Sequence, residues 1–144
     1  MIPEFNNLGY LPAGKPHKAT WEEFQLRFGG NEHRGKLLKG LKSALTNLKE
    51  AGCARVYIDG SFITNKEKPN DWDGCWEMEG VDFELIDSVI IDADFFPDRM
   101  KEKYQGDLFP QNLKLPGGNY LRFFQSDRTG FKKGIVEIDL GTLK

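Results

Sequence analysis

Two short groups of residues near the middle of the chain have the types and spacing to do chemistry together. Gly60 and Ser61 follow the apolar run 56–58, and Asp71 and Asp73 come shortly after them. The apolar run favours a strand and Gly allows positive φ, so the Gly-Ser pair predicts a tight turn with N–H groups facing a ligand. On an extended chain the two carboxylates share one face and repel each other unless a cation lies between them. Mg²⁺ binds one or two carboxylates and leaves its other positions to water and phosphate, so the pattern predicts a metal and nucleotide site.

Two strands and a spacer must position these residues. We expect a first strand over 55–59 and a second over 71–79. On the second strand the aspartates would lie on a wet, acidic face, while Trp72 and Trp76 would lie on a packed face. The spacer 62–70 is expected to form one helical turn before Pro69. It carries Lys66 and Lys68, which we expect within reach of whatever the turn binds.

The helices are indicated by caps and by apolar spacing. Thr20 and Glu23 have the capping-box spacing, which predicts a helix over 21–28. Leucines three and four residues apart predict a longer amphipathic helix from Asn31 that ends at Gly52. Further expected elements complete the chain: a short helix from Asp82, an extended 89–92, a helix over 97–104, a loop over 107–119, and strands over 120–125 and 134–140.

These elements predict a single α+β domain over 1–144, a mixed β-sheet backed by helices, with an extended N-terminal arm over 1–18. The formal net charge is −2, from 20 basic and 22 acidic side chains, so the surface as a whole is not built for nucleic acid. Two cysteines do not suffice for a disulfide framework. No apolar run approaches the roughly 18 residues of a membrane span. We therefore expect a cytoplasmic protein without membrane contact.

The order of these features resembles the minimal nucleotidyltransferase domain of the DNA polymerase β superfamily. The features are a strand, Gly60-Ser61, a spacer, Asp71-x-Asp73 and a later acidic strand at 135–140. The whole chain is also similar to a small bacterial family of uncharacterised proteins assigned to that superfamily. Its marks are the 19–24 helix start, the 57–62 segment and the closing 134–140 segment.

The resemblance implies a reaction and assigns roles to residues. A nucleoside triphosphate would give its nucleotide to an RNA or protein acceptor, with Mg²⁺ or Mn²⁺ as cofactor. Asp71, Asp73 and Asp139 would be the catalytic metal ligands. The triphosphate would bind at Gly60 and Ser61, and its charge would be countered by Lys66 or Lys68.

Two alternatives accompany this interpretation. Glu137 or Asp59 could replace Asp139 as the third carboxylate. The chain could also be a non-catalytic module of the same fold that binds a nucleotide or a partner protein. That alternative is motivated by departures from the superfamily pattern: Asp59 before the Gly-Ser pair, Trp72 between the two aspartates, and the 74–75 pair after them.

Overall fold

The computed structural model describes residues 1–111, 114–115, 118–119 and 134–143. A five-stranded mixed sheet lies at its centre, in the order β1-β7-β2-β3-β4. The strands are β1 (His17–Ala19), β2 (Arg55–Asp59), β3 (Trp72–Trp76), β4 (Gly106–Pro110) and β7 (Val136–Asp139). A separate pair consists of β5 (Lys114–Leu115) and β6 (Gly118–Asn119). The mixed α and β architecture predicted from the sequence is confirmed.

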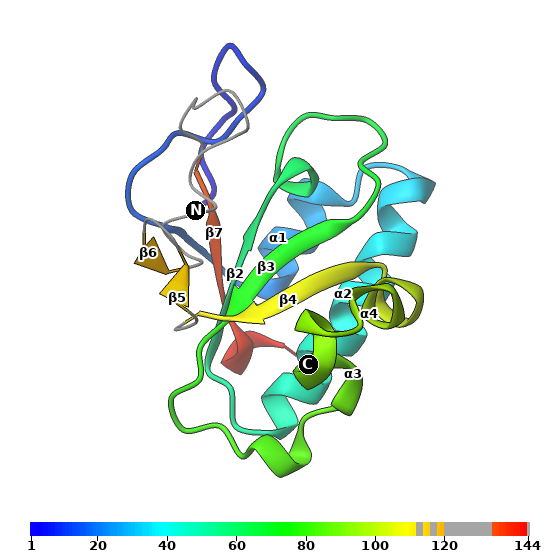
Figure 1. Cartoon of the computed structure of the whole chain (residues 1–144). Helices are drawn as coiled ribbons and strands as arrows, with labels where there is room; N and C mark the ends of the chain where they lie inside the picture. The colour runs from blue at the N-terminus through cyan, green and yellow to red at the C-terminus, as the bar shows by residue number, and fades with distance from the viewer. Residues whose placement is uncertain (112–113, 116–117, 120–133, 144) are drawn as a thin grey trace.

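The central strand β2 runs antiparallel to both of its neighbours, β3 and β7. The outer pairs, β1 with β7 and β3 with β4, are parallel. Figure 1 shows α1 and α2 behind this sheet and α4 beside its β4 edge. The helices are α1 (Trp21–Phe28), α2 (Glu32–Glu50), α3 (Ser88–Ile91) and α4 (Pro97–Tyr104).

Local signals account for the two helices behind the sheet. Thr20 caps α1 by accepting a hydrogen bond from the N–H of Glu23, and Asn31 caps α2 through the N–H of Arg34. Gly52 follows α2 with φ at +96°, the left-handed conformation that ends helices. The predicted bounds of α1 and the predicted end of α2 are therefore confirmed.

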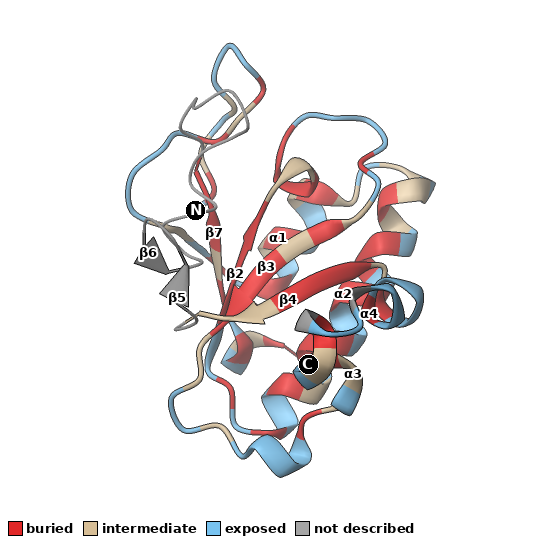
Figure 2. Cartoon of the chain, viewed as in Figure 1, coloured by how far each residue is buried: buried red, intermediate tan, exposed pale blue. Residues whose placement is uncertain are grey.

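The sheet packs its helix-facing side into the main core. Alternate residues of β2 and β3 lie there, and Trp72 and Trp76 are almost completely buried. Figure 2 shows buried strands and exposed outer helix surfaces. The opposite face carries a smaller apolar cluster of Tyr57, Cys75 and Ile135. The predicted division of the Asp71 strand into an aromatic packed face and an acidic face is thus confirmed.

Two predictions from the sequence are wrong, and a third concerns residues that the structure does not describe. Residues 106–110, most of them expected in a loop, form β4, because they pair with β3 along its whole length. Residues 88–91, expected to be mainly extended, form the short helix α3, which Asp87 caps through the N–H of Val89. The strand predicted at 120–125 lies outside the described residues.

Gly106 explains how β4 can lie so close to β3. A Cβ atom at this position would lie 2.2 Å from the indole ring of Trp72. The indole Nε1 of Trp72 in turn donates to the carbonyl of Tyr104, at 2.8 Å, which ties the end of α4 to β3. Gln105, with φ at +64°, then reverses the chain directly into β4. None of the helices in the described part of the chain is long and apolar enough to cross a membrane.

Candidate metal centre

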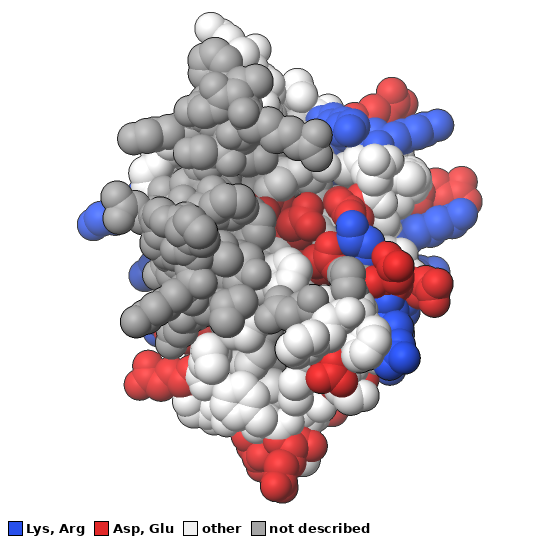
Figure 3. All heavy atoms as spheres, in the orientation of Figure 1, with Lys and Arg blue, Asp and Glu red and all other residues white. Residues whose placement is uncertain are grey.

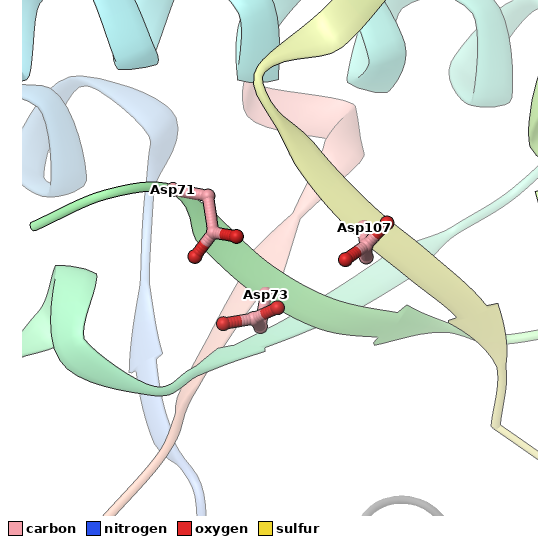
Figure 4. Close-up of side chains that lie close together, drawn as sticks. All are labelled: Asp71, Asp73 and Asp107. Atoms are coloured by element: carbon pink, nitrogen blue, oxygen red, sulfur yellow. The ribbon is translucent and has the colours of Figure 1, made fainter. Parts of the chain in front are cut away.

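Three aspartates converge at one end of the acidic sheet face. One carboxylate oxygen from each of Asp71, Asp73 and Asp107 lies within 4.8 Å of the others. Figure 4 shows Asp71 and Asp73 at the start of β3 and Asp107 on β4, with their carboxylates turned toward a common space. The prediction that Asp71 and Asp73 share a face is confirmed.

Strand register brings the third carboxylate to this place. Asp73 is paired with Asp107 across the parallel β3 and β4, and with Asp59 across the antiparallel β2 and β3. Directly paired residues project to the same side of a sheet. Asp59 therefore belongs to the same side of the sheet, and it is only 3% exposed. Burial first, and then the charge of Asp59, raise the pKa of the Cys75 thiol.

Asp107 is the most deeply set of the three converging carboxylates. The residue is 7% exposed, and its Oδ1 atom is buried without a hydrogen-bond partner among the described residues. Burial raises the pKa of Asp107; the ammonium of Lys101 opposes this effect, and the charges of Asp71 and Asp98 add to it. A buried acceptor without a donor destabilises the fold by about 1–3 kcal/mol. A bound cation or a proton would satisfy this oxygen.

One lysine already lies among these carboxylates. The Nζ atom of Lys101 is 3.3 Å from an oxygen of Asp71 and 3.3 Å from Oδ2 of Asp107. The charge of Asp107 is the main reason why the pKa of Lys101 is raised, while partial burial opposes the shift. Figure 3 shows acidic side chains gathered on this face with a basic one among them. Lys101 comes from α4 and was not singled out in the sequence.

The Gly-Ser turn adjoins the same carboxylates. Gly60 has φ at +78°, and a Cβ atom there would lie 2.9 Å from Oδ2 of Asp73. Ser61 begins a 3₁₀ turn over Ser61–Ile63, and its carbonyl accepts hydrogen bonds from the backbone N–H and the hydroxyl of Thr64. The predicted turn with positive φ is confirmed, and it lies beside Asp73.

A buried arginine fixes the segment that follows the turn. Arg34, on α2, is 6% exposed. Its guanidinium donates five hydrogen bonds to backbone carbonyls, which belong to Phe28, Phe62, Thr64 and Lys66. It also lies over the ring of Phe62, 5.0 Å from the centroid. Arg34 thus holds the first part of the segment after Gly60 and Ser61, and Asn31 contacts its later part by donating to the carbonyl of Glu67.

The two lysines predicted to face the nucleotide lie further along that segment. Both Lys66 and Lys68 are exposed. Lys68 lines a surface hollow together with Asn31, His33 and Lys36 at the start of α2. None of the described ion pairs joins Lys66 or Lys68 to the three aspartates.

The structure does not bring Asp139 to the other two predicted ligands. In β7, Asp139 is paired with Arg55, at the end of β2 opposite to the Asp59 and Asp73 pair. The two pairs are four residue steps apart along β2, which is about 13 Å. The carboxylate of Asp139 accepts from the N–H of Gly141 and lines a hollow of about 400 Å³ near the N-terminus. The predicted grouping of Asp139 with Asp71 and Asp73 is therefore wrong.

Of the two alternatives to Asp139 as the third carboxylate, one lies away from Asp71 and Asp73 and the other lies beside Asp73. Glu137 is paired with Tyr57 and lines the same hollow as Asp139, so it too lies away from the three aspartates. Asp59 lies beside Asp73 but does not belong to the group of three that could hold an ion. The third position falls to Asp107. Its one local signal is an acidic residue directly before the apolar pair 108–109, which is typical of a short strand.

The donor set suits a hard divalent cation. Carboxylate oxygens are the ligands that Mg²⁺ and Mn²⁺ take in proteins. Around one ion with bonds of 2.0–2.1 Å, only two of three ligand oxygens can lie opposite each other, about 4.2 Å apart, and neighbouring oxygens lie about 3 Å apart. The three oxygens, which lie within 4.8 Å of one another, would therefore have to move closer together around the ion. Oδ1 of Asp107, which is buried and has no hydrogen-bond partner in the described part of the chain, is a further acceptor at this place. The residues present therefore fit the cofactor that the sequence pattern implies.

Comparison with known proteins yields one relationship. No curated protein and no solved structure gives a significant match to the chain. A protein family described as a family of unknown function, DUF6932, matches residues 3–139. Because this match spans nearly the whole sequence, the chain belongs to the DUF6932 family.

Proposed function

We propose that this chain is a metal-dependent nucleotidyltransferase that moves a nucleotide from a nucleoside triphosphate to an RNA or protein acceptor. The observation that carries the proposal is the convergence of Asp71, Asp73 and Asp107, with a buried carboxylate oxygen that no described donor satisfies. A Gly-Ser turn with positive φ lies against one of these carboxylates. We also propose that the fold of the chain is that of the nucleotidyltransferases.

The carboxylates hold Mg²⁺ or Mn²⁺ in this proposal. Bound there, the metal would neutralise charge on the transferred phosphoryl group and align the attacking and leaving oxygens. Asp107 takes the part that the resemblance gave to Asp139. There it would hold the metal next to the acceptor hydroxyl and help to take up the proton of that hydroxyl, the role that the resemblance implies for the third carboxylate.

The turn supplies the phosphate contacts. The Cα of Gly60 lies against the carboxylate of Asp73, so a phosphate that binds the N–H groups and the hydroxyl of the Gly60 and Ser61 turn would be close to a metal held by Asp73. Arg34 keeps the following segment in place through its carbonyl contacts. Lys66 and Lys68, exposed on that segment, remain our candidates for countering the charge of the outer phosphates.

One observation favours a second candidate function, a non-catalytic module that binds a nucleotide or a partner protein. Lys101 already pairs with Asp71 and Asp107, so part of the acidic charge is balanced without any metal. In this alternative the ion pairs hold α4 against the sheet edge. Metal would then leave the stability of the protein unchanged.

Metal-dependent thermal stability separates the two candidates. A cation that binds only the folded chain stabilises it by RT ln(1 + [L]/Kd), or about 2.7 kcal/mol at a hundredfold excess over Kd. Melting temperatures of the wild type, Asp73→Asn and Asp107→Asn should be measured with and without Mn²⁺. We expect a gain for the wild type only. Asp139→Asn is the matched control, because it removes the same charge at the other end of β2 and should keep the gain.

Transfer itself is tested with labelled nucleoside triphosphates in cell extract. We expect the wild type to label an RNA or a protein, and Asp73→Ala to lose the label, because in-line attack needs the metal that this carboxylate holds. Asp139→Ala should retain it. Absence of labelled product with all four nucleotides, together with unaltered melting in Mn²⁺, would contradict the proposal.

A further inference from the structure

Lys101 holds a position that a metal ion would also favour. Its ammonium lies 3.3 Å from each of two carboxylates in the group of three. A divalent ion held by the same oxygens would come within a few ångströms of the ammonium, and two cations at that distance repel each other strongly. Lys101 and a metal therefore cannot both lie between Asp71 and Asp107 in this arrangement.

Lys101 does not satisfy all of the acceptor atoms of the carboxylates that it contacts. Oδ1 of Asp107 stays buried and without a donor among the described residues even though Oδ2 pairs with Lys101. A neighbouring lysine on the same helix behaves differently. Lys103 pairs with Asp87, whose carboxylate also accepts from the hydroxyl of Tyr104 and the N–H of Val89. Lys103 thus joins a carboxylate with several donors, while Lys101 leaves an acceptor open.

Lys101 is also able to leave. Its side chain is 48% exposed. Its backbone, by contrast, is fixed, because the carbonyl of Lys101 accepts from the N–H of Gln105 at the end of α4 and the chain then enters β4 directly. Movement would therefore be confined to the flexible side chain, whose base on α4 stays beside the acidic site.

We propose that Lys101 is a built-in counter-cation of the acidic site, which gives up its place to the metal and then binds the phosphates of the incoming nucleotide. This inference rests on the proposed function and adds a residue to its phosphate-binding set. Metal alone must displace the ammonium without offering it a new partner. Metal together with a triphosphate provides that partner, so each ligand should strengthen the binding of the other.

Calorimetry on the metal-free full chain tests this inference. Mn²⁺ is titrated alone and then in the presence of a non-hydrolysable ATP analogue. In the wild type we expect weak binding of Mn²⁺ alone and at least tenfold tighter binding with the analogue. In Lys101→Met we expect Mn²⁺ alone to bind about tenfold tighter than in the wild type, and the gain from the analogue to shrink. Lys101→Gln provides a second uncharged variant should the Met variant fold poorly.

Two variants control for general charge effects. Lys103→Met removes the same charge from the same helix but leaves the acidic site untouched, and should bind Mn²⁺ like the wild type. Lys101→Arg keeps the charge and should keep the weak binding of Mn²⁺ alone. Equal affinity for Mn²⁺ in the wild type, Lys101→Met and Lys101→Gln would overturn the role of Lys101 but leave the metal site standing. Absence of Mn²⁺ binding in all variants would overturn the metal site as well.

Discussion

Replacing Arg34 by Met should destabilise the protein strongly, because this side chain is the only described link between α2 and the carbonyls of Phe62, Thr64 and Lys66. All of the N–H directions of its guanidinium face backbone oxygens, at distances between 2.7 and 3.2 Å. Burial lowers the pKa of Arg34, but an arginine stays charged at every ordinary pH. A methionine of similar length would leave the carbonyls facing an apolar group.

The magnitude follows from the bonds that are lost. A hydrogen bond to a charged group contributes about 1.5–3 kcal/mol, and bonds within one network do not add. We therefore expect a loss of about 3–5 kcal/mol in the free energy of unfolding. For a chain of 144 residues the unfolding entropy is about 0.3 kcal/mol/K, so the melting temperature should fall by about 10–17 °C.

Circular dichroism melting and urea denaturation measure this loss. Arg34→Lys should lie between the wild type and Arg34→Met, since an ammonium keeps the charge but cannot reach all of the carbonyls. Arg27→Met is the matched control on α1. Within the described part of the chain Arg27 makes one hydrogen bond, to the carbonyl of Ile2, and its guanidinium lies over the ring of Phe5, so its loss should stay at about 1–2 kcal/mol. Equal melting of Arg34→Met and Arg27→Met would refute the reasoning.

Two further predictions concern Asp87 and Gly60. Burial alone would raise the pKa of Asp87, but hydrogen bonds from Lys103, Tyr104 and a backbone N–H outweigh it and lower the pKa below its ordinary 3.8. An Asp whose pKa is lower in the folded than in the unfolded chain stabilises the fold at pH values above its unfolded pKa, and this stabilisation is lost as the pH falls through the folded pKa. Asp87→Asn should therefore be less stable than the wild type by about 1 kcal/mol at pH 7. In chemical denaturation this difference should shrink below about pH 4. Gly60→Ala should lower stability by about 1–2 kcal/mol and abolish the gain in Mn²⁺, because the new methyl group meets Asp73. Gly14→Ala, also at positive φ but in open space, should lower stability and keep any metal gain.

Local signals were sufficient for the helices of this protein. Capping residues and apolar spacing are properties of neighbouring residues, so α1 could be predicted from Thr20 and Glu23, and α4 from Pro97 at its first position. The prediction for 88–91 was wrong because the β-branched residues of this segment favour a strand. In the structure Asp87 caps a short helix there, and this helix buries Ile90.

Strand partners could not be predicted in the same way. β4 is five residues long, begins with Gly106 and ends with Pro110, and both residue types ordinarily indicate a loop. It is a strand because β3 pairs with it, and Gly106 is needed there because Trp72 lies against its backbone. Both facts involve residues about thirty positions apart, which no local pattern records.

The misplaced third carboxylate has the same origin. The last strand was predicted correctly as a strand, and Asp139 shares its acidic face with Asp73. Its register against β2 could not be predicted, and that register puts it at the wrong end of the sheet. Asp107 could not be recognised as a candidate ligand, because the composition of 107–119 is typical of a loop. Alternation along a strand therefore predicted the face of the site, while strand pairing decided which residues meet on it.

The balance of charge at this end of the sheet bears on what the site does. An ion pair that serves only to hold α4 needs one carboxylate for Lys101, as Lys103 needs only Asp87. Lys101 instead lies between two carboxylates of a group of three, and a buried oxygen of Asp107 is still without a described donor. We propose that this arrangement serves a cation that binds from solution, because the ion pairs alone leave that oxygen without a donor among the described residues. Tighter Mn²⁺ binding in Lys101→Met is the result that separates the two explanations.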